Sequence, residues 1–205
     1  EALTDGTVTD PETSRRYLRI IRDESGRLGD LTRVLLSLAD LDAGVVEFDR
    51  GPVDAEALAD SVRARFEPRA AERSVRFEVG ALDAAVPLGD AARLLQAASA
   101  VVDNALEYTP PGGEVLVSAR AEPGCWILTV DDSGPGIPPG DREAVFERFT
   151  RLDRSRSTTG GGSGLGLSLS RRLVRLMDGD VRAEDSPLGG ARIVLELPAQ
   201  AQAQR

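Results

Sequence analysis

Two basic residue types are missing from this sequence of 205 residues. It contains no histidine and no lysine, so all 25 of its basic side chains are arginines. Without histidine, the chain has no Ser-His-Asp triad, no Cys-His dyad and no His-ligated metal site. Without lysine, it has no Schiff-base chemistry and no P-loop lysine. We interpret the arginine-only usage as codon bias of a GC-rich genome and only weakly as a sign of function.

Cysteine is scarce and long apolar runs are absent. The single Cys125 precludes an intramolecular disulfide and fits a reducing compartment, and its neighbours CWILTV favour a buried thiol in a strand over a nucleophile. No apolar run approaches the roughly 18–20 residues that cross a bilayer, and no signal-peptide pattern opens the chain. The formal charge of −9 disfavours nonspecific binding to nucleic acid or to an anionic membrane.

The chain begins with a polar connection at 1–13. A long amphipathic stretch follows and predicts a helix over 14–44. Its leucines at 28, 31, 35 and 38 alternate steps of three and four, and Ile21 lies seven residues before Leu28, which is a heptad-like seam. The seam requires a partner, which is either its own domain or a second copy of the helix. We favour the second copy, because the seam ends abruptly at a linker over 45–52 (VVEFDRGP).

The remaining sequence mixes helical and strand patterns. We expect helices at 53–73, 90–108 and 165–177, a strand at 74–80, a hairpin of 114–122 with 125–132, strands at 180–185 and 191–198, a loop-like stretch at 133–164 and a frayed tail at 199–205. Mainly antiparallel strands with helices on one face predict an α+β sandwich.

Two glycine-bearing segments flank the loop-like stretch. DSGPG at 132–136 is a weak signal, since it is also typical of a plain turn. GGGSGLGLSLS at 160–170 leads glycines into a helix, which leaves backbone N–H groups uncovered at a helix N-terminus and favours an anion such as phosphate. It is neither a Walker A loop nor a Rossmann fingerprint. The alternative is a flexible linker into the helix.

The order of the motifs is more specific than any one of them. Asn104 on a helix, then DSGPG, VFERF, GSGLGL and PLGGA, resembles the ATP-binding domain of sensor histidine kinases, within the gyrase, Hsp90, histidine kinase and MutL group. The resemblance implies a Bergerat-type fold, which is a two-layer α+β sandwich of a mixed, mainly antiparallel sheet and helices, preceded by one long helix. It also implies a remnant of the dimerisation and phosphotransfer hairpin at 1–44, with its second helix at 14–44, a linker at 45–52, the ATP-binding catalytic domain at 53–198 and a disordered tail at 199–205.

The resemblance assigns roles to the residues that match the motifs. Asn104 is the expected Mg²⁺ ligand, because a hard cation takes an amide oxygen readily. Tyr108, one turn further along the helix, is expected to cover the adenine ring. Asp132 is expected to accept a hydrogen bond from the exocyclic amine of adenine, which selects adenine over guanine. The other expected ATP-binding residues are Gly134, Gly136 and Ile137 near the base, Gly162, Gly164 and Gly166 around the triphosphate, and Leu165 and Leu167, which hold that helix to the sheet.

The loop between these motifs carries four further candidates. Phe146 and Phe149 are expected to anchor a lid over the nucleotide. Arg148 and Arg151 are candidates to contact phosphate or the partner helix, and the alternative for both is a solvated lid.

Two positions depart from the family pattern. Ala100 stands where the family usually places another Asn, and where its ATPase cousins carry a catalytic Glu, so ATP hydrolysis by their route is not expected. Glu107 stands where a basic residue commonly precedes the tyrosine. Because 100, 104, 107 and 108 share one helix face, we predict weaker nucleotide affinity than the family norm and a stronger dependence on Mg²⁺.

The larger departure is the missing histidine, since the family's phosphoacceptor lies on the first helix of the hairpin. The opening EALTDG resembles the end of that helix, and a shortened chain is the favoured explanation over a natural loss of the site. The resemblance implies the ATP-binding kinase core of a bacterial two-component sensor histidine kinase, with a response regulator as partner and a homodimer in the intact protein. It implies a cytoplasmic portion of a membrane-anchored sensor, with spanning segments upstream. The alternatives are a degenerate, non-catalytic nucleotide-binding and interaction module and an anti-sigma-type serine kinase.

Overall fold

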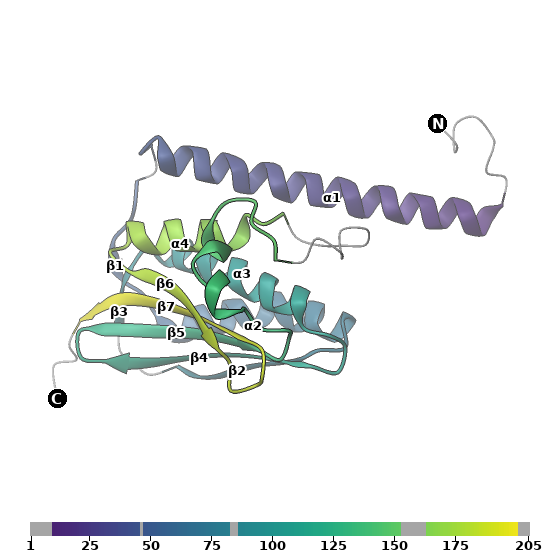
Figure 1. Ribbon diagram of the computed structural model, residues 1–205. Coiled ribbons are helices and arrows are strands. Elements are labelled where there is room, and N and C mark those ends of the chain that lie inside the picture. The colour runs from purple at the N-terminus through teal and green to yellow at the C-terminus, as the bar shows by residue number, and fades with distance from the viewer. Residues whose placement is uncertain (1–9, 46, 83–85, 153–162, 201–205) are drawn as a thin grey trace.

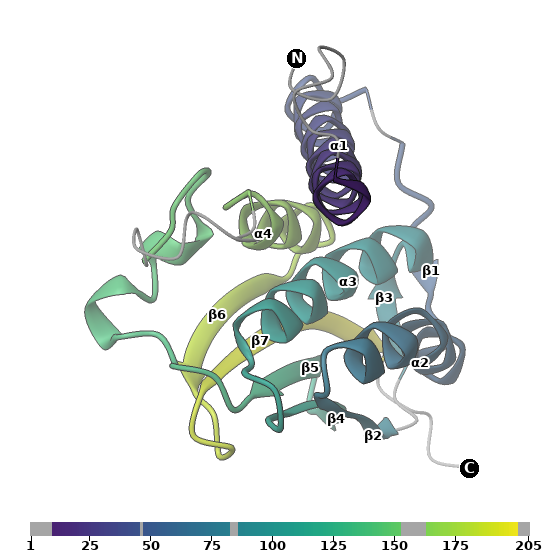
Figure 2. The same cartoon turned by 90° about the vertical axis from the view of Figure 1, so that its right-hand side faces the viewer.

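Helices cover one face of a mainly antiparallel sheet, and a long helix lies across them on the side away from the sheet (Figures 1 and 2). This is a computed structural model, and it describes residues 10–45, 47–82, 86–152 and 163–200. The α+β sandwich preceded by one long helix is confirmed. Among the described residues, no helix has both the length and the apolar character that crossing a bilayer requires.

Aspartates cap the N-termini of three of the four α-helices in the described part of the chain. The helices are α1 (Pro11–Asp42), α2 (Ala55–Glu72), α3 (Ala91–Tyr108) and α4 (Gly166–Leu176), and two short 3-10 turns are η1 (Pro139–Asp141) and η2 (Ala144–Phe146). The carboxylates of Asp10, Asp54 and Asp90 accept hydrogen bonds from backbone N–H groups of the first turns of α1, α2 and α3, groups that have no partner within the helix. Residues 11–13 were predicted as part of a connection, but they are helical because Asp10 caps the helix and Pro11 occupies its first position.

The sheet follows the order β1-β3-β7-β5-β4-β2, with β6 also paired to β7. The strands are β1 (Gly51–Pro52), β2 (Arg76–Leu82), β3 (Val86–Gly89), β4 (Glu114–Glu122), β5 (Cys125–Asp132), β6 (Asp180–Asp185) and β7 (Ala191–Gln200). Only the β2–β4 pair is parallel among the described strands. The predicted hairpin of 114–122 with 125–132 is confirmed, and Ser118 lies opposite Thr129 in its register.

Three parts of the sheet were missed or wrongly bounded in the sequence predictions: β1, β3 and the end of β7. The linker prediction for 45–52 missed β1, and β3 was not predicted at all. Both are short and carry a proline, a residue type that is depleted in strands, so the residue pattern does not reveal either strand. The predicted tail begins too early, because Ala199 pairs with Pro87 and Gln200 with Val86. Residues 201–205 lie outside the described residues.

The core lies between the sheet and helices α2, α3 and α4. Its largest fully buried side chains include Trp126 and Leu128 on β5, Phe66 on α2, Leu94 on α3 and Leu173 on α4. The apolar positions of α3 recur at steps of three and four, as expected for a helix with one face in a core.

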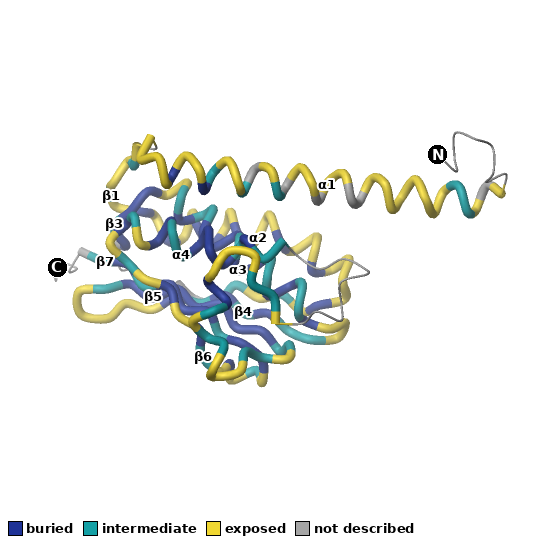
Figure 3. Tube along the Cα trace, turned by 45° about the horizontal axis from the view of Figure 1, so that its top comes forward, coloured by how far each residue is buried: buried dark blue, intermediate teal, exposed yellow. Residues whose placement is uncertain are grey.

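The predicted apolar seam of α1 is buried at its C-terminal end and exposed to solvent in its N-terminal part. Leu38 and Leu41 near its C-terminal end are buried in the domain core, whereas Ile21 and Leu28 are 53% and 64% exposed. Figure 3 shows the same division, because burial on α1 is concentrated at the end that meets α4. The C-terminal end of the seam therefore packs on its own domain, and its N-terminal part remains open.

Candidate functional site

A cleft of about 1560 Å³ opens beside α3 and the start of α4. Ala100, Asn104, Glu107 and Tyr108 of α3 all line it, so the shared helix face predicted from their spacing is present. One wall comes from α1 and another from the residues between β5 and η2. The cleft is the place where the candidate site residues from distant parts of the chain meet.

Asn104 presents its amide to this cleft. The side chain is half-buried, and within the described chain it makes no hydrogen bond to the protein, so the amide is available to a ligand. No group of three or more His, Cys, Asp or Glu residues that could hold a metal occurs in the described ranges. A cation at Asn104 would therefore need most of its oxygen ligands from a nucleotide and from water.

Asp132 forms the buried end of the cleft. It is 4% exposed, and its Oδ1 accepts hydrogen bonds from the backbone N–H groups of Gly134 (2.8 Å) and Ala191 (3.1 Å). Burial raises the pKa of this carboxyl, and the two backbone hydrogen bonds oppose the increase. Both bonds end on Oδ1, which leaves Oδ2 as the oxygen available to a ligand.

The turn before β7 fixes Asp132, and it was not assigned a role from the sequence. A Cβ at Gly190 would lie 2.3 Å from Asp132 Oδ1, so only glycine lets the chain approach this closely. Next to it, Asp131 is fully buried and accepts from Arg192 Nε (2.8 Å) and Nη2 (3.0 Å) and from Ser186 Oγ (2.9 Å). The PLGGA motif was the available signal, although it did not reveal these contacts.

The glycine segment enters α4 at the other side of the cleft. Gly164, Gly166 and Leu167 line the cleft at the N-terminal end of α4. Gly164 has φ +70°, and its carbonyl accepts from Phe149 N at 2.9 Å, which joins the segment after η2 to the residues that lead into α4. A Cβ at Gly164 would lie 2.9 Å from the carbonyl carbon of Phe149, so both space and backbone conformation require glycine.

The other predicted residues divide into those that line the cleft and those that support it. Gly136, Ile137 and Arg151 line the cleft. The backbone N–H of Gly134 donates a hydrogen bond to Asp132 Oδ1 and so supports that side chain. Leu165 and Leu167 are buried in the core, as expected for residues that hold α4 to the sheet. Gly162 lies outside the described residues.

The structure differs from the prediction for one of the two expected lid anchors, Phe149, and for one of the two candidate phosphate contacts, Arg148. Phe146 is buried, but Phe149 is 60% exposed, so only its backbone takes part in anchoring. Arg148 is not among the cleft-lining residues, because its Nη2 pairs with Asp42 at the end of α1 at 2.5 Å. This hydrogen bond lowers the pKa of Asp42, and Arg172 lies 3.5 Å from the same carboxylate. Arg148 therefore contacts the helix of its own chain rather than the cleft.

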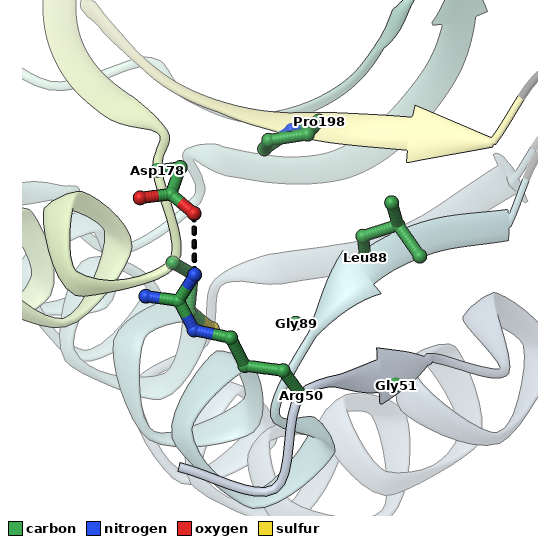
Figure 4. A pocket seen from close by; sticks show the side chains of 7 residues that line it. Arg50, Gly51, Leu88, Gly89, Asp178 and Pro198 are labelled. Carbon is green, nitrogen blue, oxygen red and sulfur yellow. Dashed lines mark hydrogen bonds and ion pairs between the residues drawn. The ribbon is translucent and has the colours of Figure 1, made fainter.

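A second, smaller cavity of about 240 Å³ lies where the linker meets the end of α4 (Figure 4). Arg50 crosses it, donating to Asp178 Oδ2 (2.5 Å) and to the carbonyl of Leu176 (2.6 Å). Nearby, Asp49 N donates to Asp90, the capping residue of α3. These contacts fasten the linker to the start of α3 and the end of α4, two of the helices that line the main cleft.

Comparison with known proteins identifies the class to which this arrangement belongs. Residues 89–201 match the family described as histidine kinase-, DNA gyrase B-, and HSP90-like ATPase. The signal transduction histidine-protein kinase BaeS of Escherichia coli is 34% identical over 206 residues, covering 100% of this chain and 43% of BaeS. The sensor-like histidine kinase SenX3 of Mycobacterium tuberculosis is 34% identical over 190 residues, covering 93% of this chain and 46% of SenX3.

Solved structures agree with this class. Full-length ShkA in complex with AMPPNP superposes with a TM-score of 0.77 at 32% identity, covering 93% of this chain and 40% of ShkA. The mycobacterial sensor histidine kinase MprB gives a TM-score of 0.64 at 34% identity, covering 75% of this chain and 99% of the MprB structure.

The chain belongs to the histidine kinase-, DNA gyrase B-, and HSP90-like ATPase family, and it carries the ATP-binding catalytic domain of histidine kinases. It spans less than half the length of the curated relatives BaeS and SenX3. The comparisons support neither alternative considered from the sequence, the non-catalytic module or the serine kinase.

Proposed function

We propose that ATP binds in the main cleft with its base at Asp132 and its phosphates at the start of α4. Oδ2 of Asp132 would accept from the exocyclic amine of adenine, and Tyr108 would cover the ring. Gly136 and Ile137 would border the base. The glycines around 164 leave backbone N–H groups uncovered at the N-terminus of an 11-residue helix, where an anion is favoured. Gly162 and Arg151 would complete the triphosphate site.

Asn104 would supply the protein's oxygen ligand to a Mg²⁺ ion held between it and the phosphates. A magnesium ion typically keeps several waters and takes few protein ligands when it is bound with nucleotide, which fits a lone amide better than a carboxylate cage. Glu107 on the same face would repel a bare triphosphate, so the metal would matter more here than in relatives with a basic residue.

In the complete protein, the γ-phosphoryl group would pass from ATP to an imidazole nitrogen of a histidine, and ADP would leave. That histidine is absent from this chain. The phosphoryl group would then pass to an aspartate of a response regulator. We further propose that the intact protein is a homodimer through the hairpin, that its signal enters from a membrane-anchored region upstream, and that this portion faces the cytoplasm.

The observation that carries the proposal is the convergence of Asn104, Asp132 and Gly166 on one cleft from three separate segments. Its test is phosphoryl transfer to a separate helical hairpin that carries the acceptor histidine, using γ-labelled ATP. We expect label on the hairpin and none on this chain. Tight ATP binding without any transfer, across several hairpins of related kinases, would contradict the kinase assignment.

The metal assignment has its own test in calorimetric titrations of an ATP analogue with Mg²⁺ and with EDTA. We expect Asn104→Ala to weaken binding about tenfold or more in Mg²⁺, because one metal ligand is lost, and to leave the weak metal-free binding unchanged. The matched control is Gln96→Ala, an amide on the same helix that also lines the cleft, about two turns nearer the N-terminus. Tight binding without metal would disprove the assignment.

A further inference from the structure

We propose that Arg171 is a positioning residue for nucleotide binding: it holds residues 137–146 in place as the outer wall of the cleft. This inference rests on the proposed ATP site. Arg171 lies on α4, five residues after Gly166, and its side chain is only 13% exposed. It is itself not a cleft-lining residue, so any effect on the nucleotide must pass through the residues that it contacts.

The guanidinium joins three elements. Its Nη1 donates to Glu143 just before η2 (2.5 Å), and its Nε lies 3.3 Å from Asp180 at the start of β6. Its central carbon also lies 5.0 Å from the centroid of the Phe146 ring, within cation–π range. A planar group with several fixed donors suits this triple contact, which a lysine ammonium would satisfy only in part.

The wall depends on such contacts because it has little regular structure of its own. The segment contains only η1 and η2, whose backbone hydrogen bonds are local, such as Phe146 N to Glu143 O and Asp141 N to Pro138 O. Segments without ladder hydrogen bonds open at low free-energy cost. Ile137, Asp141 and Val145 of this segment line the cleft, so displacement of the segment would change the shape of the nucleotide site.

The fold as a whole does not depend on Arg171 to the same degree. Its carboxylate partners are 79% exposed at Glu143 and 57% exposed at Asp180, so removing the arginine leaves no buried unpaired charge. Asp180 also keeps its ion pair with Arg175 at 2.9 Å. Arg175→Ala is therefore the matched control, because it removes a neighbouring cation from the same helix and the same aspartate without touching residues 137–146.

The experiment compares Arg171→Ala, Arg171→Lys and Arg175→Ala with the unaltered chain. We expect Arg171→Ala to weaken binding of Mg²⁺ and an ATP analogue by about tenfold, the scale of a charge-assisted hydrogen bond with a ring contact. In the absence of nucleotide, hydrogen exchange should accelerate at the amides of Asp141, Phe146 and Glu147 and stay unchanged in β5 and β7. Arg171→Lys should recover part of the affinity, and Arg175→Ala should match the unaltered chain.

Unchanged exchange at these three amides in Arg171→Ala would overturn the proposal, whatever happens to affinity. So would an equal loss of affinity in Arg175→Ala, or faster exchange spread across the whole sheet, which would show a general loss of stability. If the unaltered chain failed to bind the analogue, the ATP assignment would fall, while the exchange data would still decide whether Arg171 holds the wall.

Discussion

At the scale of single residues, Asp132 combines a cost to the stability of the fold with the role that we propose for it in binding adenine. A carboxylate that is almost fully buried is poorly solvated, which is why its pKa is raised. A raised pKa in the folded state means that ionisation of this group opposes folding, so its contribution to stability falls as pH rises from the ordinary aspartate range through the raised pKa. The charge is therefore better explained by a ligand than by stability.

This predicts the behaviour of Asp132→Asn. The amide oxygen can still accept from Gly134 N and Ala191 N, so urea unfolding at pH 7 should show stability equal to or above that of the unaltered chain. The amide N–H₂ would replace Oδ2 and face the amine of adenine, donor against donor. ATP affinity should fall about tenfold or more, while affinity for inosine triphosphate, which lacks that amine, should not fall.

The pH dependence of ATP affinity in the unaltered chain provides a second test of the role proposed for Asp132. ATP affinity should decline as pH falls through the raised pKa of Asp132, at a higher pH than an ordinary aspartate would give, and this decline should disappear in Asp132→Asn. Asp131→Asn is the contrasting variant, since it weakens a buried pair with Arg192 and should reduce stability. An equal loss of affinity for ATP and for inosine triphosphate in Asp132→Asn would contradict the proposed contact between Asp132 and the amine of adenine.

At the scale of elements, the linker is part of the domain rather than a loose tether. Gly51 and Pro52 pair with β3, and Arg50 reaches the end of α4. Residues 45–52 have the pattern of a linker because the partners of Asp49, Arg50 and Gly51 lie more than 30 residues away in the chain. Capped helices and the β4–β5 hairpin were predictable, because their signals are local. The β1–β3 pairing and the Arg50 contact were not, because only the folded chain brings their partners together.

This attachment can be measured through trypsin, which cleaves after arginine. Asp178→Asn removes the charge that holds Arg50, and we expect faster cleavage of the Arg50–Gly51 bond. Asparagine is the appropriate substitution because residue 178 has φ +62°, a conformation that asparagine tolerates better than alanine. Asp60→Asn is the control, since it breaks a similarly exposed pair with Arg63 on α2. Identical cleavage rates in both variants would show that Arg50 does not hold the linker.

At the scale of the whole molecule, α1 divides its apolar residues between two neighbours. Sequence periodicity predicted one seam and left open whether the seam packs on the domain or on a second copy. The structure shows which positions the domain covers: Leu31, Val34 and Leu38 turn toward it, whereas Leu18, Ile21 and Leu28 stay exposed. A heptad pattern identifies a helix that needs partners, but the tertiary packing of α4 determines which positions the domain itself covers.

The exposed half of α1 predicts where the interface lies in the homodimer that we propose for the intact protein. In a longer chain that includes both helices of the hairpin, Leu28→Glu should convert the dimer to a monomer in sedimentation velocity. Burying one leucine stabilises by about 1.5–3 kcal/mol, and the loss occurs twice in a symmetric dimer, with a buried carboxylate added in each copy. ATP affinity should not change, because Leu28 does not line the cleft. Arg19→Glu is the control. It changes the charge of the helix by two units, compared with one for Leu28→Glu, but it lies away from the helix face that carries Ile21 and Leu28. It should therefore leave the dimer intact. A dimer that survives Leu28→Glu, or dissociates equally in both variants, would place the interface elsewhere.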